Sequence, residues 1–359
     1  MTPVSGSLVR DSHTLTEILS QPQVWRTALR GLTENAAFQS IRAKARTPRP
    51  WLFIGCGTSF YLAEAAAANW SLLTGQVAWA LPASEVLLFP QLAHLAQRDL
   101  EAVIISRSGR TSEAVRAADL LRQKHKVSTL AVTCAPESEL AKSCEWTIAL
   151  PEADEKSMVM TRSFSSMLLA LLELAAESGG VPGFPANLET LATTLASTIE
   201  TWSDRLEAFV LKHAFTDYVY LGQGPFFPIA REAALKVTEM SNSYAQAYHT
   251  LEFRHGPKSI VAPETCITFF LSESGMPAET GVLLEMKELG GTIVSVCNQA
   301  SEAVRRASDL LFELGTTLSE PFLLAPFIIP AQLLGYHTGT RKGFNPDEPK
   351  NLSRVVLLD

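Results

Sequence analysis

The sequence contains the same order of segments twice, and this internal repeat limits the fold more than any other feature. WLFIGCGTSFYLAEAAAANW, from Trp51, is similar to YVYLGQGPFFPIAREAALKV, from Tyr218: in both, an apolar run ends in Gly-x-Gly and an alanine-rich helical pattern follows. AVIISRSG and ITFFLSESG, which end at Gly109 and Gly275, form a second pair. The first pair is offset by 167 residues and the second by 166, so we predict a duplicated domain.

Each copy reads as apolar strand, turn, helix and apolar strand, which is typical of a parallel sheet covered by helices. The strands are continuous apolar runs without alternation, as expected when both faces of a sheet are buried. We therefore predict an α/β protein with two tandem doubly wound, flavodoxin-like domains. The predicted segments are an N-terminal arm (1–30), a first domain (31–180), a second domain (190–340) and a C-terminal tail (341–359), with a Gly- and Pro-rich connection at 177–189.

Composition excludes several classes of function. The formal charge is −7, with 30 Lys and Arg against 37 Asp and Glu, so we expect no nucleic-acid partner. The start has no leader pattern and no stretch approaches 18 uninterrupted apolar residues, so we expect a cytoplasmic protein with no membrane partner. Five scattered cysteines, mostly in apolar runs, predict reduced thiols.

The stretch SRSGRTSE, residues 106–113, places four hydroxyl side chains where a predicted buried strand meets a helix. In doubly wound sheets, ligands bind at the carboxyl ends of the strands, where helix N-termini present free N–H groups. Ser106, Ser108 and Thr111 are suitable donors to a phosphate, and Gly109 lets the backbone turn closely around it. The alternative is that these residues only cap the helix.

The second copy serves as an internal comparison for this loop. It keeps the hydroxyls as Ser272 and Ser274 but has Glu273 where the first copy has Arg107. A carboxylate repels a phosphate, whereas Arg107 and Arg110 attract it, so we predict one phosphate site per chain, in the first copy.

The loop GCGTS, residues 55–59, lies at the end of the first predicted strand. A dinucleotide fingerprint needs a third glycine, but Phe60 occupies that position, so we expect no NAD and no other cofactor. Thr58 and Ser59 are instead candidate donors to the same phosphate pocket.

The helical segment from 231 carries Glu232, Lys236 and Glu239, whose spacing places them on one helix face. The alternative is a solvated stripe, but the segment follows the Gly-Gln-Gly-Pro turn at the ligand edge of the second sheet. His255 lies in a Gly- and Pro-bounded loop rather than on an apolar face. His249 and His255 match no metal-ligand spacing, so we expect no metal site.

Taken together in this order, the motifs resemble those of the tandem sugar isomerase (SIS) domain family, which includes the isomerase half of glucosamine-6-phosphate synthase. GCGTS and Ser-x-Ser-Gly-x-Thr resemble its sugar-phosphate loops, EAALKVTE its catalytic helix, and HGP and NPDEPKNL its later signatures. MVMTRSFSSMLLA and HGPKSIV look closer to the tagatose/galactosamine-6-phosphate isomerase and deaminase branch.

The resemblance implies a role for each candidate residue. Glu239 would move a proton between C1 and C2, Lys236 would assist at the sugar oxygen and Glu232 would support the site. His255 would open the sugar ring from a neighbouring subunit, which implies a homodimer. The residues expected around the phosphosugar are Thr58, Ser59, Ser106, Arg107, Ser108, Thr111 and Arg354.

Three departures from the family pattern limit the expected activity. The tail lysine of the synthase corresponds to Arg354, which cannot act as an amine nucleophile, and Lys350 is displaced by four residues. Met160 replaces a polar sugar-contacting position. The first cysteine is Cys56, so we expect no glutaminase activity of this chain.

The resulting prediction is an aldose–ketose isomerase of a hexose or amino-hexose 6-phosphate that works through an enediol and could release ammonia from an amino sugar. Two alternatives stay open from the sequence. One is a sugar-phosphate-binding sensor without catalysis, because the fold alone does not select a function. The other is a deglycase of a phosphorylated sugar–amine conjugate.

Overall fold

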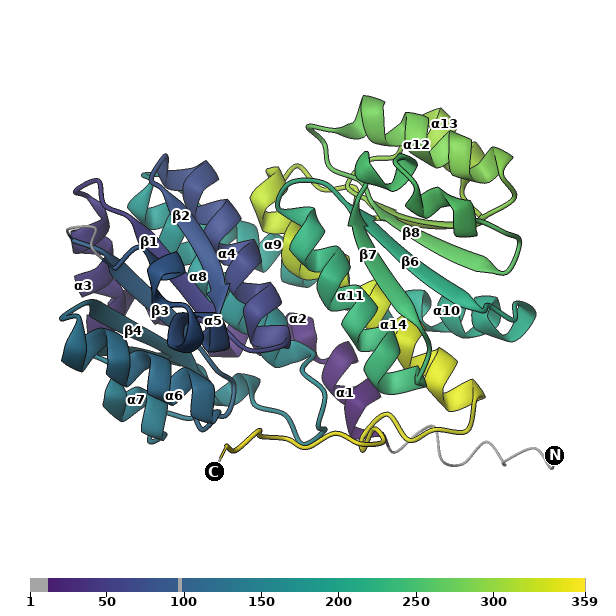
Figure 1. The fold of residues 1–359 in the computed structure, drawn as a ribbon. Coiled ribbons are helices and arrows are strands. Elements are labelled where there is room, and N and C mark those ends of the chain that lie inside the picture. Colours follow the sequence, from purple (N-terminus) through teal and green to yellow (C-terminus); the bar gives the residue numbers. More distant parts are fainter. Residues whose placement is uncertain (1–11, 96–98, 359) are drawn as a thin grey trace. The chain divides into compact units, whose positions relative to one another are not determined.

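The computed structural model describes residues 12–95 and 99–358. Their contacts divide into two compact units. Unit 1 contains residues 12–22, 156–161 and 191–352, and unit 2 contains residues 23–155, 162–190 and 353–358 apart from the gap. Each unit holds one parallel five-stranded sheet, as the repeat predicts (Figure 1).

The sheet of unit 2 has the strand order β2-β1-β3-β4-β5, and all its pairs are parallel. This is the order of doubly wound flavodoxin-like sheets. Its strands are β1 (Trp51–Gly55), β2 (Ala78–Pro82), β3 (Glu101–Ile105), β4 (Ser128–Thr133) and β5 (Trp146–Ala149). Its helices are α3 (Ala36–Ala45), α4 (Thr58–Thr74), α5 (Ala83–Leu88), α6 (Ser112–Asp119), α7 (Glu139–Ser143) and α8 (Arg162–Ser178), with short helices η1 (Leu32–Glu34), η2 (Pro90–Ala93), η3 (Leu120–Lys124) and η4 (Pro151–Ala153).

Helices cover both faces of this sheet. On one face, Trp51 and Phe53 of β1 pack on Trp70 of α4, with ring centroids 4.1 and 5.9 Å apart. On the other face, Leu52 and Ile54 join a buried cluster with residues of α5, α6 and α7. Because side chains alternate along β1, these two contacts confirm that the strand is buried on both faces.

The sheet of unit 1 repeats this order as β7-β6-β8-β9-β10, again with parallel pairs. Val219 and Leu221 pack with α12 and α13 on one face, while α11 lies against β6 and β7 and is covered in turn by α14. The strands are β6 (Asp217–Gly222), β7 (Ala245–His249), β8 (Thr265–Phe270), β9 (Thr292–Cys297) and β10 (Leu310–Glu313). The helices are α1 (His13–Leu19), α10 (Ile199–Lys212), α11 (Phe226–Ser241), α12 (Met276–Glu288), α13 (Glu302–Ala307) and α14 (Leu324–Arg341), with η5 (Glu252–Arg254), η6 (Pro257–Ile260) and η7 (Glu320–Leu323). Two helices, α2 (Gln21–Ala28) and α9 (Phe184–Ala196), cross the boundaries between units.

The Gly-x-Gly turns have the same geometry in both copies. A Cβ on Gly55 would lie 2.2 Å from the Ser59 carbonyl oxygen, and one on Gly222 would lie 2.3 Å from that of Phe226. The second glycine of each turn, Gly57 or Gly224, has φ of 54°. Only glycine fits the close approach and readily adopts this φ, so the motif fixes the angle at which α4 and α11 leave their sheets.

The two units are not continuous in sequence, which differs from the four continuous segments that we predicted: each unit includes a short segment from a distant part of the chain. Residues 156–161 join unit 1 although they lie between parts of unit 2, and the chain end 353–358 joins unit 2. The described end of the chain, residues 353–358, forms no strand. It instead runs beside α6, where the Ser112 N–H donates to the Val356 carbonyl at 3.3 Å.

Candidate active site

The charged face predicted on α11 is present in unit 1. The Lys236 ammonium lies 2.5 Å from Glu239 Oε2 and 3.2 Å from Glu232 Oε1. The side chains of Lys236 and Glu232 are fully buried, whereas that of Glu239 is 16% exposed. The three residues are therefore a buried ion network with one carboxylate that opens to solvent, and not a solvated stripe.

The burial of this network follows from close helix packing. Gly335 and Gly339 of α14 face α11: a Cβ on Gly335 would lie 3.0 Å from the Lys236 carbonyl oxygen, and one on Gly339 would lie 2.1 Å from that of Met240. The two glycines let the helix backbones approach, which excludes water from the side chains between them. Asn242, with φ of 47°, then ends α11 in a left-handed conformation.

The electrostatics of the network keep the lysine charged. Burial alone lowers the pKa of Lys236, but the carboxylates of Glu232 and Glu239 raise it above its ordinary value. A fixed ammonium at 2.5 Å also stabilises negative charge on Glu239. The arrangement thus presents one partly exposed carboxylate that is oriented by a cation from behind, which is suitable for accepting and returning a proton.

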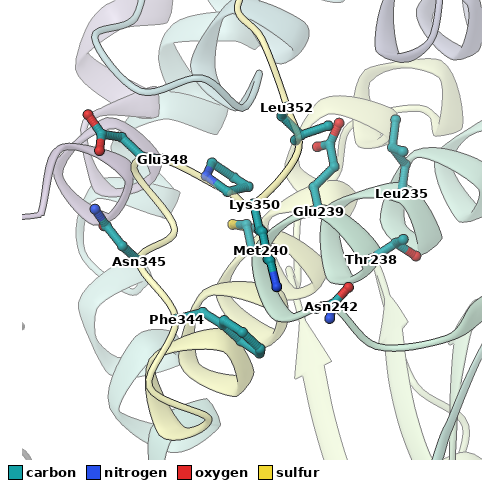
Figure 2. A pocket seen from close by; sticks show the side chains of 11 residues that line it. Leu235, Thr238, Glu239, Met240, Asn242, Phe344, Asn345, Glu348, Lys350 and Leu352 are labelled. Atoms are coloured by element: carbon teal, nitrogen blue, oxygen red, sulfur yellow. The ribbon is translucent and has the colours of Figure 1, made fainter.

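Glu239 lines a pocket of about 280 Å³ between the second half of α11 and the segment 344–352 (Figure 2). This volume is close to the lower end of small-ligand pockets. Figure 2 shows the Glu239 carboxylate beside Leu352, whereas Lys350 extends past Met240 toward Asn242. The residues that line the pocket are Leu235, Thr238, Glu239, Met240, Asn242, Phe344, Asn345, Glu348, Pro349, Lys350 and Leu352.

The two basic residues of the tail have different surroundings. Lys350 lines the Glu239 pocket and forms no ion pair with any residue that the structure describes. Arg354 belongs to unit 2, where its guanidinium lies 3.0 Å from Asp154 in an exposed ion pair. No motif or spacing indicated this acidic partner, which is 200 residues away from Arg354.

In unit 2, the loop after β3 gathers the predicted hydroxyls. The Ser106 and Thr111 hydroxyl oxygens are 3.3 Å apart, and the Gly109 N–H donates to Ser106 Oγ at 3.2 Å. Ser108 Oγ accepts from the Arg110 N–H at 3.2 Å. Gly109, with φ of 60°, makes the turn. The loop is a compact set of donors directly ahead of α6.

Thr58 and Ser59 begin α4, directly after the Gly-x-Gly turn. Because β1 pairs with β3 in parallel, these residues and the Ser106 loop follow neighbouring strands at the same edge of the sheet. Both side chains are largely buried, with relative exposures of 6% and 5%. The two loops of unit 2 therefore form one polar edge, as the sequence predicts.

Arg107 and Arg110 behave differently from each other. The Arg107 guanidinium lies 3.2 Å from Glu155 Oε2, and both residues are buried. Glu155 also accepts a hydrogen bond from the Ser163 hydroxyl. The positive charge of Arg107 is thus balanced within the protein, while Arg110 is exposed. Sequence reasoning missed Glu155, since nothing in the spacing connects it with the loop 48 residues earlier.

The matching loop of unit 1 is occupied by carboxylates of the chain itself. Ser272 donates to Glu279 from its N–H at 2.8 Å and from its hydroxyl at 3.1 Å. The Glu273 N–H and the Ser274 hydroxyl donate to Glu320 at 2.6 and 2.7 Å. Burial raises the pKa of Glu279 to about 7. The donors that hold an anion in such a turn are therefore already engaged in this copy.

His255 lies between η5 and η6 and is exposed. Its N–H donates to the Glu252 carbonyl at 2.9 Å. Arg254 and Lys258, on either side, both contact the Glu285 carboxylate of α12 at 2.6 Å, which holds the loop in place. The imidazole is thus accessible on the surface of unit 1, and its role across a subunit boundary stays a prediction.

Within residues 12–95 and 99–358, no cluster of three or more His, Cys, Asp or Glu side chains is arranged to hold a metal ion. Across the same residues, none of the helices combines the length and apolar character needed to cross a membrane.

Comparison with known families identifies the duplicated unit. The family model of the SIS domain matches residues 48–177 and again residues 193–336. The glutamine–fructose-6-phosphate aminotransferase (isomerizing) of Pyrobaculum aerophilum is 27% identical over 360 residues, which cover 96% of this chain and 57% of that protein. The corresponding protein of Pseudomonas aeruginosa is 29% identical over 370 residues, 96% of this chain and 58% of the relative. The chain therefore spans less than two thirds of these relatives.

Solved structures resemble the chain over nearly its whole length. A glucosamine-6-phosphate deaminase from Thermotoga maritima has a TM-score of 0.78 and 29% identity, and the match covers 97% of this chain and 100% of that one. A tagatose-6-phosphate ketose/aldose isomerase from Escherichia coli has a TM-score of 0.85 and 23% identity, with 98% of both chains covered. The second likeness is evidence of the shared fold alone.

Proposed function

The chain belongs to the SIS domain family, and from this premise we propose that it is a sugar-phosphate isomerase that acts on a hexose or amino-hexose 6-phosphate through an enediol. The observation that carries the proposal is the network on α11. A buried ammonium holds a partly exposed carboxylate, Glu239, at the edge of a pocket suited to a small ligand. A site that only bound a sugar would not need a carboxylate placed in this way.

The proposed reaction uses Glu239 as the base. Its carboxylate removes the proton from C2 of the open-chain aldose, which leaves an enediolate with its charge on O1. The hydroxyl proton of O2 passes to O1, and Glu239 returns its own proton to C1, which gives the ketose. Lys236 stabilises the negative charge of Glu239 before the transfer, and Glu232 keeps Lys236 charged in its buried position. Positioned acid–base groups of this kind typically supply about 10² to 10⁴ in rate.

The phosphate ester is proposed to bind the loop after β3 in unit 2. Ser106, Ser108 and Thr111 offer hydroxyls there, and Thr58 and Ser59 lie at the same edge of the sheet. Arg107 pairs with Glu155, so in this proposal it shapes the loop and contributes less positive charge than an unpaired arginine. The carboxylates that occupy the equivalent loop of unit 1 support one phosphate site per chain.

Ring opening is assigned to His255 of a second subunit, and the active form is then a homodimer. The exposure of His255 on a loop held by Glu285 supports this assignment. Arg354 pairs with Asp154 and cannot form an imine with the sugar, so the proposed route passes through the enediol without a covalent sugar–lysine intermediate.

Release of ammonia from an amino sugar is a variant of the same chemistry. The T. maritima protein, whose name states a glucosamine-6-phosphate deaminase, supports including amino-hexose phosphates among the substrates. A deglycase would use the same proton transfer with a different amine as leaving group. Isomerisation and deamination differ in whether C2 carries oxygen or nitrogen, and all three activities require the same base. The two that release an amine also consume one water, which hydrolyses the imine left by the proton transfer.

The test is solvent-proton exchange at C2. The wild-type protein, incubated in D₂O with a panel of hexose and hexosamine 6-phosphates, is expected to incorporate deuterium at C2 of one of them, and ketose and free ammonia are assayed in parallel. Glu239→Gln should abolish the exchange and leave sugar-phosphate binding within about threefold, because the amide keeps the shape of the side chain but is not a base. Glu348→Gln, which alters the other carboxylate of the pocket, should keep the exchange.

Two outcomes would count against the proposal. Exchange that survives in Glu239→Gln would exclude this residue as the base. Saturable binding across the panel, without exchange, ketose or ammonia from the wild-type protein, would favour the sensor.

A further inference from the structure

The segment 344–352 forms one wall of the Glu239 pocket, although it contains no helix or strand. Fixing an irregular segment costs backbone conformational entropy at every residue, so a wall of this kind needs an anchor. Most of its side chains are exposed, and burial of apolar surface is therefore a weak anchor here. The contacts that hold the segment must be sought in its polar groups.

Asp347, in the middle of the segment, makes these contacts. Its Oδ1 accepts three hydrogen bonds of 2.7 Å, from the Ser12 hydroxyl, the Thr14 N–H and the Thr14 hydroxyl. Its Oδ2 accepts a fourth, of 2.9 Å, from the His13 N–H. A single side chain thus ties the pocket wall to the beginning of α1, more than 330 residues earlier in the sequence.

The backbone of Asp347 is held as well. Its carbonyl accepts from the Met158 N–H at 3.1 Å. Residues 156–161 are in turn fixed to α1, because Glu17, which is buried, accepts from the Lys156 N–H at 2.6 Å and from the Ser157 hydroxyl. One short helix therefore braces two segments that are remote from each other in sequence.

The helix itself is attached to the frame that carries the active site. Gln21, which begins α2 one residue beyond Ser20 at the end of α1, donates to Gln332 of α14 at 2.8 Å, and Gln332 donates to the Thr161 carbonyl at 3.3 Å. Since α14 is the helix that packs on α11, the chain of contacts from Asp347 ends at the helix that bears Glu239.

We infer that Asp347 is a positioning residue for the Glu239 pocket, which it shapes by fixing the segment 344–352 to α1. The inference rests on the proposed function. In the native protein the pocket wall is formed before the substrate arrives, so binding does not have to order it. Without the carboxylate, substrate binding must also order the segment, and this cost reduces the apparent affinity and leaves the chemical step unchanged.

Two substitutions at Asp347 and one control test this role. Asp347→Ala removes all four hydrogen bonds, and hydrogen bonds to a charged group are stronger than those between neutral groups. We therefore expect KM to rise about tenfold or more, with kcat within about twofold of wild type. Asp347→Asn retains one acceptor oxygen, so its KM should lie between those of the wild type and Asp347→Ala. Asp309→Ala removes a carboxylate that accepts from the Ile293 N–H at 2.8 Å, pairs with Lys287 and does not line this pocket, so it should leave KM unchanged.

Hydrogen–deuterium exchange of the segment 342–352 separates this inference from the proposed function, because it needs no substrate. Asp347→Ala should speed exchange there about tenfold or more, and Asp309→Ala should not. Unchanged exchange in the alanine variant overturns the inference whatever the enzyme does. If Asp347→Ala lowers kcat and leaves KM unchanged, the inference is overturned too, because that pattern indicates general destabilisation. If Asp347→Ala speeds exchange of the segment 342–352 but the wild-type protein has no isomerase activity, the proposed function is rejected and the role of Asp347 in fixing the segment is retained.

Discussion

Replacing Lys236 is the sharpest test of the buried network on α11. Its ammonium lies between Glu232 and Glu239, at 3.2 and 2.5 Å, and Lys236→Met removes the cation while nearly keeping the volume of the side chain. Glu239 is 16% exposed and water can solvate it, but Glu232 is fully buried and would lose the ammonium that lies 3.2 Å from its Oε1. Breaking a buried ion pair from one side typically costs about 3 to 5 kcal/mol, so we expect a loss of that size at pH 7.5.

The double variant Glu232→Gln/Lys236→Met is the matched comparison. It removes both charges, and removing both partners of a buried pair is often close to neutral. We therefore expect it to recover at least half of the stability lost in Lys236→Met. The single variant should also recover stability as the pH falls toward 5, because a buried carboxylate without its cation takes up a proton there. In the wild-type protein the sign is different: the raised pKa of Lys236 keeps its contribution intact at neutral pH and lets it decline only in alkali.

Trp202 makes the measurement specific for unit 1. It is the one tryptophan among residues 191–352 and packs on Phe312 with ring centroids 5.4 Å apart. Urea unfolding followed by the ¹⁹F resonance of fluorotryptophan at this position reports on the unit that holds α11. A Lys236→Met variant within 1 kcal/mol of wild type, or a double variant no more stable than the single one, would show that Glu232 does not depend on Lys236 and would refute the reasoning.

Two further predictions concern the loops and the response to acid. Ser108→Ala should weaken sugar-phosphate binding, measured by calorimetry, about 10- to 100-fold, because it removes a hydroxyl contact to a charged group. Ser274→Ala, in the loop occupied by Glu320, should leave this binding unchanged. Equal effects of the two substitutions would contradict one phosphate site per chain. Burial lowers the pKa of His337 from 6.5 to about 4. The free energy of unfolding should therefore fall by about 3 kcal/mol as the pH falls between these values. A His337→Gln variant that shows the same loss in acid, measured through Trp202, would rule out His337 as the cause.

The repeat allowed the fold to be predicted because its signal is local. A strand that ends in Gly-x-Gly and continues into a helix is specified by neighbouring residues, and Gly55 and Gly222 make the same close approach in both copies. The shared face of Glu232, Lys236 and Glu239 was predictable for the same reason, since helical spacing alone brings them together. Their distances confirm that geometry, while their roles in catalysis stay predictions.

The tail shows where local reasoning ends. The family resemblance implied Arg354 as a substrate ligand, and this role stays a prediction, but its ion pair with Asp154 was not predictable. Nothing in the sequence singled out Asp347, whose partners lie at the opposite end of the chain. Both contacts depend on segments that exchange between units, and no periodicity or spacing encodes such an exchange.

The paired Ser-x-Ser-Gly loops separate what a motif specifies from what it binds. In both copies the local sequence builds the same turn, in which a serine hydroxyl accepts from the glycine N–H, Gly109 or Gly275. The occupant is decided elsewhere: Glu320, 46 residues beyond Ser274, engages the second loop. The charge difference between Arg107 and Glu273 is therefore only part of the argument for one phosphate site per chain, because Arg107 is itself paired with Glu155. The stronger asymmetry lies in the partners of the hydroxyls. In the first loop, Ser106 and Thr111 contact each other, whereas in the second loop Ser272 and Ser274 donate to the carboxylates of Glu279 and Glu320. A phosphate would therefore have to displace a carboxylate only in the second copy.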